Sequence, residues 1–446
     1  MLKPYPKYKE TPALWLNSIP NHWESHKIRE LFVERNEKVS DKDYPPLSVS
    51  KAGVVPQIAT VAKTNDGDNR KLVKKGDFAI NSRSDRRGSS GISNYDGSVS
   101  LINIVLKPRS FVNGRYMHYL LKSHYFIEEF YRNGRGIVAD LWTTRYTEMK
   151  SIYLPVPSIE EQDQIVSFLD WKLMKINKLI RAKKKQIALL NEQKQVIIHN
   201  AVTKGVDPNV PMKDSGIEWI GQIPQEWVVN RLKTQISLST SKKNRDNEFY
   251  IGMENIQSWT GKYVSTTEID SEGICNIFEN NNILFGKLRP YLAKVYLTEN
   301  NGVCSSEFLV LKNFNGILRY MFYVLLSYKF IDLVNSSTYG AKMPRANWGF
   351  IGNCSIPIPS LEEQNKIASY LDDKCYKIEN LKAKIQNEIE LLYEYRTRLI
   401  SDVVTGKVDV RDIEIPEYEA DSDETIDDEI DDNLVLDEED GEMEVE

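Results

Sequence analysis

The sequence predicts an α+β protein in which two mixed α/β domains occur in tandem, each followed by one long helix, with the two helices pairing as an antiparallel coiled coil. Three observations predict this class: a repeat of about 200 residues, a proline- and glycine-free segment ending each copy, and heptad spacing of apolar residues in both segments. The predicted boundaries are 1–157 and 208–358 for the domains, 158–207 and 359–410 for the helices, and 411–446 for an acidic tail.

Two sets of matching residues define the repeat. Residues 15–23 (WLNSIPNHW) match residues 219–227 (WIGQIPQEW), with two tryptophans and an Ile-Pro pair at identical spacing. Residues 157–162 (PSIEEQ) match residues 359–364 (PSLEEQ) at an offset of 202. Because the same landmarks recur in the same order, we expect each copy to be one structural unit.

Each long helix has start and end signals. In both copies a serine and a glutamate three residues later, Ser158 and Glu161 in the first, have the spacing of a capping box. In that arrangement the hydroxyl accepts a hydrogen bond from a helix amide and the carboxylate accepts one from the N-cap amide. Gly205 and Gly406 mark the ends of the helices. About 45 residues at 1.5 Å each predict a rod of roughly 65 Å.

Apolar residues at heptad spacing form a stripe two positions wide on each helix. Such a narrow stripe suits a coiled-coil seam better than a globular core. Basic residues interrupt it at Lys183, Lys194, Lys382 and Arg396, so we expect imperfect pairing. We expect the helices to pair with each other; the alternatives are packing on their own domains or on a partner protein. The predicted seam residues are Leu173, Ile176, Ile180, Ile187, Leu190, Ile197, Ile378, Ile385, Ile389, Leu392, Leu399 and Val403.

Charge is distributed unevenly along the chain, whose net charge is −6. Residues 411–446 hold 19 acidic residues and one basic residue, and the other 410 residues hold 57 basic and 45 acidic residues. A basic body fits nucleic-acid binding. The acidic tail is expected to be disordered. It could serve only solubility, or it could compete with a nucleic acid for the basic loops.

Composition also indicates the compartment. No apolar run approaches the roughly 20 residues needed to span a bilayer, and the first ten residues lack a signal-peptide core. We therefore expect a cytoplasmic protein without a membrane partner. The four cysteines have no CxxC pair, which argues against disulfides and a zinc site and favours reduced, packed side chains.

Catalytic signatures are missing from the sequence. We find no phosphate-binding loop, no H-E-x-x-H, no nucleophile elbow and no glycine-rich turn for a dinucleotide or adenosyl cofactor. The histidine pair His22 and His26 flanks Trp23, an arrangement that is more often structural than ligating. We expect no catalytic residue, no metal site and no cofactor on this chain.

Basic loops recur at matching positions in the two copies. Segments 81–91 and 134–145 in the first, and 285–291 and 339–348 in the second, combine cations with glycine and hydroxyl or aromatic residues. Arginine, lysine and small polar groups hold phosphates and bind base edges. Each segment alone could be a solvated turn; their recurrence favours a binding role. The candidate DNA-binding residues are Ser82, Arg83, Arg86, Arg87, Ser89, Arg135, Thr143, Arg145, Lys287, Arg289, Tyr291, Lys342, Arg345 and Asn347.

These segments carry a family resemblance over about residues 1–410. Residues 283–291 (ILFGKLRPY), 305–308 (SSEF), 342–345 (KMPR) and 358–364 (IPSLEEQ) resemble the specificity subunit of type I restriction-modification enzymes. Residues 80–88 (INSRSDRRG) resemble another branch of the same domain. The start of the long helix, occurring twice, is the most specific element.

The resemblance implies a function and partners. Each domain would be a target-recognition domain for one half of a split DNA sequence, and the helices would set the spacing and bind two modification subunits. Those subunits would carry S-adenosylmethionine, and restriction subunits with ATP and Mg²⁺ would join. The chain itself would be non-catalytic, and its two different loop sets would give an asymmetric target. The alternatives are a coiled-coil scaffold that binds only proteins and a self-contained methyltransferase.

Overall fold

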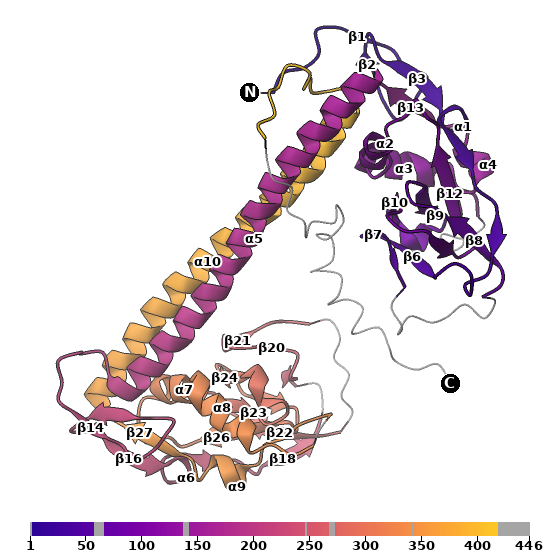
Figure 1. Cartoon of the computed structure of the whole chain (residues 1–446). Coiled ribbons are helices and arrows are strands. Elements are labelled where there is room, and N and C mark those ends of the chain that lie inside the picture. Colours follow the sequence, from indigo (N-terminus) through magenta and orange to yellow (C-terminus); the bar gives the residue numbers. More distant parts are fainter. Residues whose placement is uncertain are drawn as a thin grey trace. The chain divides into compact units, whose positions relative to one another are not determined.

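The chain divides into two compact units, described here from a computed structural model (Figure 1). Unit 1 comprises Met1–Lys183 and Asn387–Glu446, and unit 2 comprises Lys184–Gln386. Each unit therefore holds one globular domain and one half of each long helix. The structure describes residues 2–57, 67–136, 142–245, 248–266, 273–340 and 342–417, so most of the predicted acidic tail lies outside the described residues.

The domain of unit 1 is built on small antiparallel sheets covered by short helices. Its strands are β1 (Tyr8–Lys9), β2 (Ile19–Pro20), β3 (Glu24–Lys27), β4 (Phe32–Glu34), β5 (Lys38–Val39), β6 (Leu47–Ser50), β7 (Gly53–Pro56), β8 (Arg70–Val73), β9 (Phe78–Asn81), β10 (Ser90–Ile92), β11 (Gly97–Val99), β12 (Asn103–Pro108) and β13 (Tyr153–Val156). Its helices are α1 (Ile28–Leu31), η1 (Ser84–Arg86), α2 (Gly114–Leu121), α3 (His124–Arg132), α4 (Tyr146–Met149) and the start of α5 (Ile159–Lys204). The main sheet has the order β10-β9-β12-β4, and β13 pairs with β3.

The domain of unit 2 repeats this plan. Its strands are β14 (Met212–Asp214), β15 (Gln222–Pro224), β16 (Val228–Arg231), β17 (Ser237–Leu238), β18 (Lys242–Asn244), β19 (Tyr250–Ile251), β20 (Ile256–Gln257), β21 (Lys262–Tyr263), β22 (Ile274–Phe278), β23 (Ile283–Gly286), β24 (Val295–Leu297), β25 (Gly302–Cys304), β26 (Phe308–Lys312) and β27 (Ser355–Ile358). Its helices are α6 (Leu232–Gln235), η3 (Pro290–Leu292), α7 (Leu318–Leu326), α8 (Tyr328–Ser336), α9 (Trp348–Ile351) and the start of α10 (Leu361–Val404). The sheet β17-β26-β23-β24 and the pair β16-β27 match the sheets of unit 1.

Three apolar runs of the sequence, residues 98–106, 116–131 and 318–334, are each divided into two elements in the structure. The run 98–106 is two strands, β11 and β12, separated by a turn at Ser100. The helical run 116–131 is two helices, α2 and α3, and Ser123 caps the second by accepting a hydrogen bond from the amide of Phe126 at 3.4 Å. Ser327 separates α7 from α8 in the same way, without a cap hydrogen bond. The hydroxyl of Ser123 explains the break between α2 and α3, because it binds the carbonyl of Leu120 and the amide of Phe126.

The repeated tryptophans anchor each domain to the start of its long helix. Trp23 donates from Nε1 to Oε1 of Glu161 at 3.0 Å, and Trp227 donates to Oε2 of Glu363 at the same distance. The hydroxyls of Ser158 and Ser360 accept from the helix amides as predicted. The glutamates therefore serve a different purpose from the one predicted for a capping box. Their carboxylates bind the buried indoles of the domain instead.

A glutamine in each repeat closes the same junction. Gln162 accepts from the amide of Asn113 at 2.8 Å and donates to the carbonyl of Pro157 at 3.0 Å. Gln364 accepts from the amide of Ile317 at 2.9 Å and donates to the carbonyl of Pro359 at 2.9 Å. Both side chains are almost fully buried. The Glu-Gln pair of the sequence repeat therefore fixes the domain to the helix.

Within each unit the two long helices contact each other (Figure 1). In unit 1, Arg396 donates from Nη1 to Oδ1 of Asn177 at 3.3 Å. In unit 2, Nζ of Lys194 lies 2.8 Å from Oε1 of Glu379. Lys183, Lys194 and Arg396, which interrupt the predicted seam, thus have polar partners on the other helix, whereas Lys382 pairs with Glu379 of its own helix. None of the twelve predicted seam residues is exposed, and both helices end at a glycine with φ of +77°.

The core of unit 2 joins the domain to both helices. Ile198 and Val202 of α5 and Leu371 of α10 belong to the same buried cluster as Trp227 and Phe330 of the domain. Both helices therefore pack on the domain of unit 2, which the sequence left open as an alternative.

All four cysteines, which lie in unit 2, are free and buried. Burial raises the pKa of the Cys354 thiol to about 11. A neutral thiol in an apolar setting is unreactive. The cysteines are therefore packing residues, as the sequence predicted.

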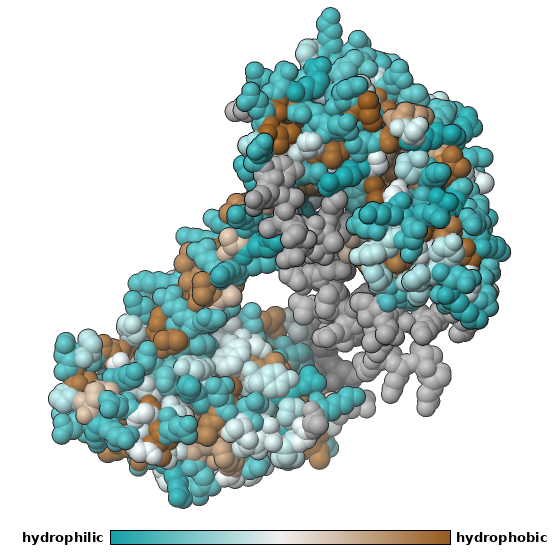
Figure 2. Space-filling model, in the orientation of Figure 1, coloured by the Kyte–Doolittle hydropathy of each residue, from teal (hydrophilic) through white to brown (hydrophobic). Residues whose placement is uncertain are grey.

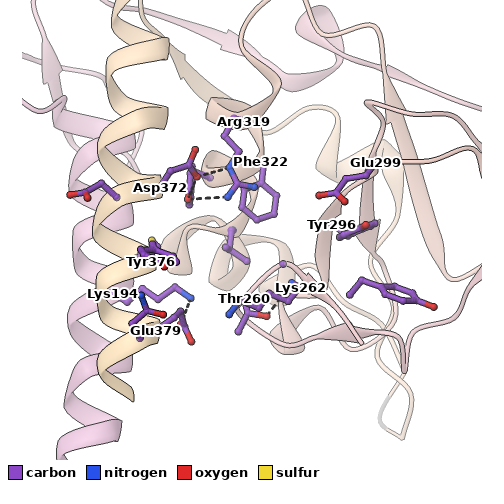
Figure 3. A pocket seen from close by; sticks show the side chains of 17 residues that line it. Lys194, Thr260, Lys262, Tyr296, Glu299, Arg319, Phe322, Asp372, Tyr376 and Glu379 are labelled. Atoms are coloured by element: carbon purple, nitrogen blue, oxygen red, sulfur yellow. Dashed lines mark hydrogen bonds and ion pairs between the residues drawn. The ribbon is translucent and has the colours of Figure 1, made fainter. Parts of the chain in front are cut away.

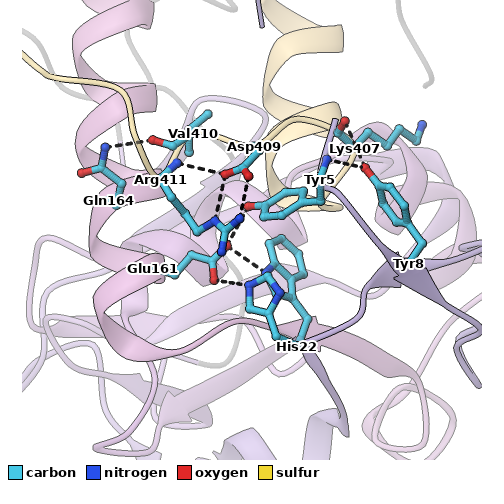
Figure 4. A network of polar contacts seen from close by, with 10 residues as sticks. Tyr5, Tyr8, His22, Glu161, Gln164, Lys407, Asp409, Val410 and Arg411 are labelled. Carbon is cyan, nitrogen blue, oxygen red and sulfur yellow. Dashed lines mark hydrogen bonds and ion pairs between the residues drawn. The ribbon is translucent and has the colours of Figure 1, made fainter. Parts of the chain in front are cut away.

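The two ends of the described chain meet in unit 1 (Figure 4). The hydroxyl of Tyr5 donates to Glu161 at 2.7 Å, and Nε2 of His22 lies 2.8 Å from the same carboxylate. The amide of Asp409 donates to the carbonyl of Lys3 at 2.8 Å. The segment after α10 is therefore held at the start of α5 in unit 1.

Candidate nucleic-acid interface

The predicted loops of unit 1 are joined by backbone hydrogen bonds. The amide of Ser84 donates to the carbonyl of Trp142 at 3.0 Å, and the amide of Thr144 donates to the carbonyl of Ser82 at 2.9 Å. Thr143 exchanges two further bonds of 3.0 Å with Arg135. Segments that lie some 50 residues apart in the sequence are thereby brought side by side at the end of strand β9.

The predicted loops of unit 2 have the same arrangement. The amide of Arg289 donates to the carbonyl of Pro344 at 2.8 Å, and the amide of Ala346 donates to the carbonyl of Lys287 at 2.9 Å. Arg345 exchanges bonds of 3.1 and 3.2 Å with Tyr339. The predicted equivalence of the loops is therefore structural: Thr143 of unit 1 corresponds to Arg345 of unit 2.

We name the two assemblies by unit. The unit 1 loop cluster comprises residues 82–89, 134–136 and 142–145. The unit 2 loop cluster comprises residues 287–291 and 339–347, without the undescribed residue 341. A shared backbone with different side chains means that the two clusters present different chemical groups.

The arginines of the unit 1 loop cluster differ in their partners. Nε of Arg83 lies 3.0 Å from Oδ1 of Asp85. Arg87 forms an ion pair with Glu128 of α3 and lies over the ring of Tyr131, 5.4 Å from its centroid. The remaining arginines are exposed, and no described carboxylate lies within ion-pairing distance of them: Arg86, Arg135 and Arg145.

The cations of the unit 2 loop cluster divide in the same way. Arg345 donates from both Nε and Nη2 to the carboxylate of Glu307, at 3.2 to 3.3 Å. These hydrogen bonds, with the carboxylate charge, raise the pKa of Arg345. Lys287, Arg289 and Lys342 have no described carboxylate within ion-pairing distance. The pair of Arg345 with Glu307 thus stands beside three unpaired cations.

The backbone of the unit 2 loop cluster is strained. Arg289 has φ of +48° and Ala293 has φ of +46°, on either side of the turn η3. Non-glycine residues in this region cost about 1 to 2 kcal/mol each, and such strain gathers at functional sites. The turn leaves Tyr291 exposed beside Arg289.

Three candidate residues, Ser82, Ser89 and Asn347, contribute to the shape of the clusters, and the two serines among them are buried. Ser82 is buried and donates from Oγ to the carbonyl of Ile102 at 2.6 Å, and Ser89 is buried as well. Asn347 uses its side-chain oxygen to cap α9 at 3.0 Å. These side chains hold the loops in shape. Their prediction as DNA contacts stays a prediction, and the conformation described here does not expose the two serines.

Sequence reasoning missed the acidic partners of the arginines. Glu307 lies 38 residues before Arg345, and Glu128 lies 41 residues after Arg87. Composition identifies a basic loop but not a carboxylate that folding brings to it. The only signal for Glu307 was its place in the motif SSEF, which the resemblance had singled out without assigning it a role.

Unit 2 also contains a polar pocket of about 790 Å³ between α7, α10 and the β20-β21 hairpin (Figure 3). Arg319 donates from Nε to Oδ1 of Asp372 at 2.6 Å, and the hydroxyl of Tyr323 donates to the same atom at 2.7 Å. Lys194 and Glu379 pair at its lower end. The charged groups of the pocket therefore bind one another. Arg115, Tyr119 and Asp170 of unit 1 make the same contacts as Arg319, Tyr323 and Asp372 of unit 2. The repetition indicates that the Arg-Tyr-Asp cluster attaches a domain to its long helix.

No group of three or more His, Cys, Asp or Glu residues within the described ranges is arranged to hold a metal ion. Among the helices that the structure describes, none has the length and apolar character needed to cross a bilayer.

Exposed leucines occur at equivalent places on the long helices. Unit 1 exposes Leu179 of α5 and Leu391 of α10, and unit 2 exposes Leu381 of α10 and Leu189 of α5. In Figure 2 hydrophobic patches lie along these helices within a mostly hydrophilic surface. Each of these leucines is about half exposed, and Leu179 corresponds to Leu381 and Leu189 to Leu391 in the sequence repeat.

Comparison with known proteins gives the family. The model of the type I restriction modification DNA specificity domain matches the chain twice, over residues 20–189 and 226–391. The chain belongs to the type I restriction-modification DNA specificity family. The resemblance predicted from the sequence is thus confirmed, and the chain is a non-catalytic DNA sequence-recognition subunit.

Relatives in this family cover most of the chain. The Type I restriction enzyme EcoDI specificity subunit of Escherichia coli is 21% identical, over 72% of this chain and 76% of its own. A putative type I restriction enzyme MjaX specificity subunit of Methanocaldococcus jannaschii is 22% identical, over 89% and 96%. A solved chain from work on assembly and conformational transition of the type I R-M system shares the fold, with a TM-score of 0.63, 13% identity, and coverage of 87% of this chain and 99% of that one.

Proposed function

We propose that the two loop clusters recognise the two different halves of an asymmetric, bipartite DNA target. The observation that carries the proposal is the shared backbone arrangement with different side chains, Thr143 in one cluster and Arg345 in the other. Bases are distinguished by side-chain groups in the major groove. Two clusters with different groups would therefore select different sequences.

The exposed cations would make most of the DNA contacts. Arg86, Arg135 and Arg145 in unit 1 and Arg289 and Lys342 in unit 2 have no described carboxylate within ion-pairing distance. Phosphate contacts of this kind supply much of the affinity and fix the register of a protein on the duplex. The buried Ser82 and Ser89 would support the unit 1 loop cluster.

The long helices would pair as an antiparallel coiled coil that fixes the spacing of the half-sites. Support comes from α5–α10 contacts in both units and from the burial of the predicted seam. A helix of 46 residues is about 69 Å long, enough to hold two recognition surfaces a DNA turn of roughly 34 Å apart.

Two modification subunits would bind the exposed leucines of the helices. The surfaces around Leu179 with Leu391 and Leu381 with Leu189 are equivalent, so one subunit would occupy each. S-adenosylmethionine would bind to those subunits, and restriction subunits with ATP and Mg²⁺ would join the same complex in the cytoplasm. The recognition chain would supply position and sequence, and its partners would supply chemistry.

The experiment is a map of methylated adenines in cells that express this chain with its modification subunits. We expect one motif with two different defined halves and a spacer of constant length. A palindromic motif, or a motif with a single defined half, would contradict the proposal. A variant with Leu179 and Leu381 changed to Asp is the control for docking, because it should abolish methylation while the chain still binds DNA.

A further inference from the structure

One arginine of the unit 2 loop cluster differs from the other cations in how it is held. The carboxylate of Glu307 accepts from Nε and Nη2 of Arg345, so it occupies one edge of the planar guanidinium. The edge formed by Nη1 and Nη2 keeps its outward hydrogens for another acceptor. A guanidinium bound along one edge has a fixed plane, and a fixed plane suits bidentate contact with guanine O6 and N7.

Glu307 is itself held in place. Its amide donates a hydrogen bond to Oγ of Ser305 at 3.3 Å. Its carbonyl accepts a hydrogen bond from the amide of Lys287 at 2.9 Å. Its side chain is 22% exposed, against 37% for Arg345. The carboxylate is therefore the inner member of the pair and the guanidinium the outer one.

The charge of the pair separates two possible roles. A carboxylate beside the guanidinium cancels its net charge and would repel a phosphate, so the pair is poorly suited to the DNA backbone. A guanine edge carries acceptors without a full negative charge, so the pair is well suited to it. Lys287, Arg289 and Lys342, which no described carboxylate neutralises, have the charge that phosphates require.

We propose that Arg345 contacts a guanine in the half-site of unit 2 and that Glu307 is the residue that positions it. The neighbouring unpaired cations hold phosphates. Unit 1 has Thr143 at the equivalent place, so this guanine contact belongs to one half-site alone. The inference rests on the proposed function and adds the assignment of base and phosphate contacts within it.

The test uses the full chain assembled with its modification subunits, and two measurements. Selection from a randomised duplex library gives the base preference at each position. Titration of a mixed-sequence duplex at several salt concentrations gives the slope of affinity against salt, which counts phosphate contacts at about 0.9 per contact. The wild-type complex must first select a bipartite sequence; if it selects none, the proposed function fails before this inference is tested.

Three variants separate the roles. Arg345→Lys keeps the charge but loses the planar fork, so guanine preference at one position should fall roughly 10- to 100-fold with the salt slope unchanged. Glu307→Gln frees the charge of Arg345, so the same preference should fall while the salt slope steepens by up to about 0.9. Lys342→Gln is the matched control, and should lower the slope by about 0.9 with every base preference retained.

The outcomes that overturn the inference are specific. If Arg345→Lys and Glu307→Gln retain the guanine preference and change affinity equally on all sequences, Arg345 is a phosphate contact. If Arg345→Lys changes base preferences in both half-sites, the substitution alters the structure of the whole chain, and Arg345 is not a contact to a single base. Circular dichroism of each variant confirms that a loss of preference is not a loss of fold.

Discussion

At the scale of single residues, buried polar side chains hold each domain to its long helix. Gln364 is 2% exposed and satisfies one amide and one carbonyl that no other described group satisfies. A buried backbone group left without a partner costs about 1 to 3 kcal/mol. The stability of the junction therefore depends on this carboxamide more than on the exposed Glu362 beside it.

Gln364→Ala should lower the free energy of unfolding by about 2 to 3 kcal/mol, because it leaves the amide of Ile317 and the carbonyl of Pro359 without partners. Urea denaturation of the full chain measures the change. Glu362→Ala, an exposed residue two positions earlier, is the matched control and should change the midpoint little. Equal effects of the two substitutions would show that the carboxamide bonds contribute nothing specific.

His199 of α5 gives the fold a dependence on pH. Burial, with the nearby charges of Lys204 and Lys329, lowers its pKa to about 4. The unfolded chain protonates this histidine below about pH 6.5, whereas the folded chain resists until about pH 4. Stability is therefore full above pH 6.5 and falls as the pH decreases toward 4.

His199→Asn should reduce the loss of stability between pH 7.5 and pH 5, measured as the shift of the urea midpoint. Some loss should remain, because burial also lowers the pKa of His118. His124→Asn, at an exposed histidine of α3, is the matched control for the substitution itself. An unchanged pH dependence in His199→Asn would contradict this assignment.

At the scale of elements, the sequence predicted the long helices best and the loop clusters only in part. Serine caps, terminal glycines and heptads act within one segment, so the helices could be located from local spacing. The burial of Ser82 and the pairing of Arg345 with Glu307 depend on segments that meet only after folding. Short strands such as β17 could not be located, because two or three residues give no periodicity.

The contact of Lys194 with Glu379 makes a prediction for the paired helices. Lys194 is almost fully buried, so Glu379→Gln leaves its ammonium without a full counter-charge and should cost about 3 kcal/mol of unfolding free energy. Lys194→Met should cost less than about 1 kcal/mol, since a methionine fills the space without a charge. Urea denaturation compares them, with Glu388→Gln, at an exposed ion pair with Lys183, as the control below about 1 kcal/mol. A larger loss from Lys194→Met than from Glu379→Gln would contradict the electrostatic argument.

At the scale of the whole molecule, duplication separates what is shared from what is specific. The shared part is the junction of domain and helix. The Trp-Glu and Gln bonds recur there in both units, and the hydroxyls of Tyr116 and Tyr320 donate to the carbonyls of Pro155 and Pro357. The specific part is the pair of loop clusters, which keep their backbone bonds and change their side chains. Such a division lets the target change through the loops while the fold and the partner surfaces stay the same.

The central claim is that each unit recognises its own half of the target, and one comparison tests it most directly. Complexes carrying either Arg83→Gln with Arg87→Gln, the carboxylate-paired arginines of the unit 1 loop cluster, or Arg345→Gln in the unit 2 loop cluster would each select from the same randomised duplex library as the wild type. We predict that the unit 1 variant loses base preference in one half-site only and the unit 2 variant in the other only. Loss in both half-sites from either variant, or full preference in both variants, would contradict the account.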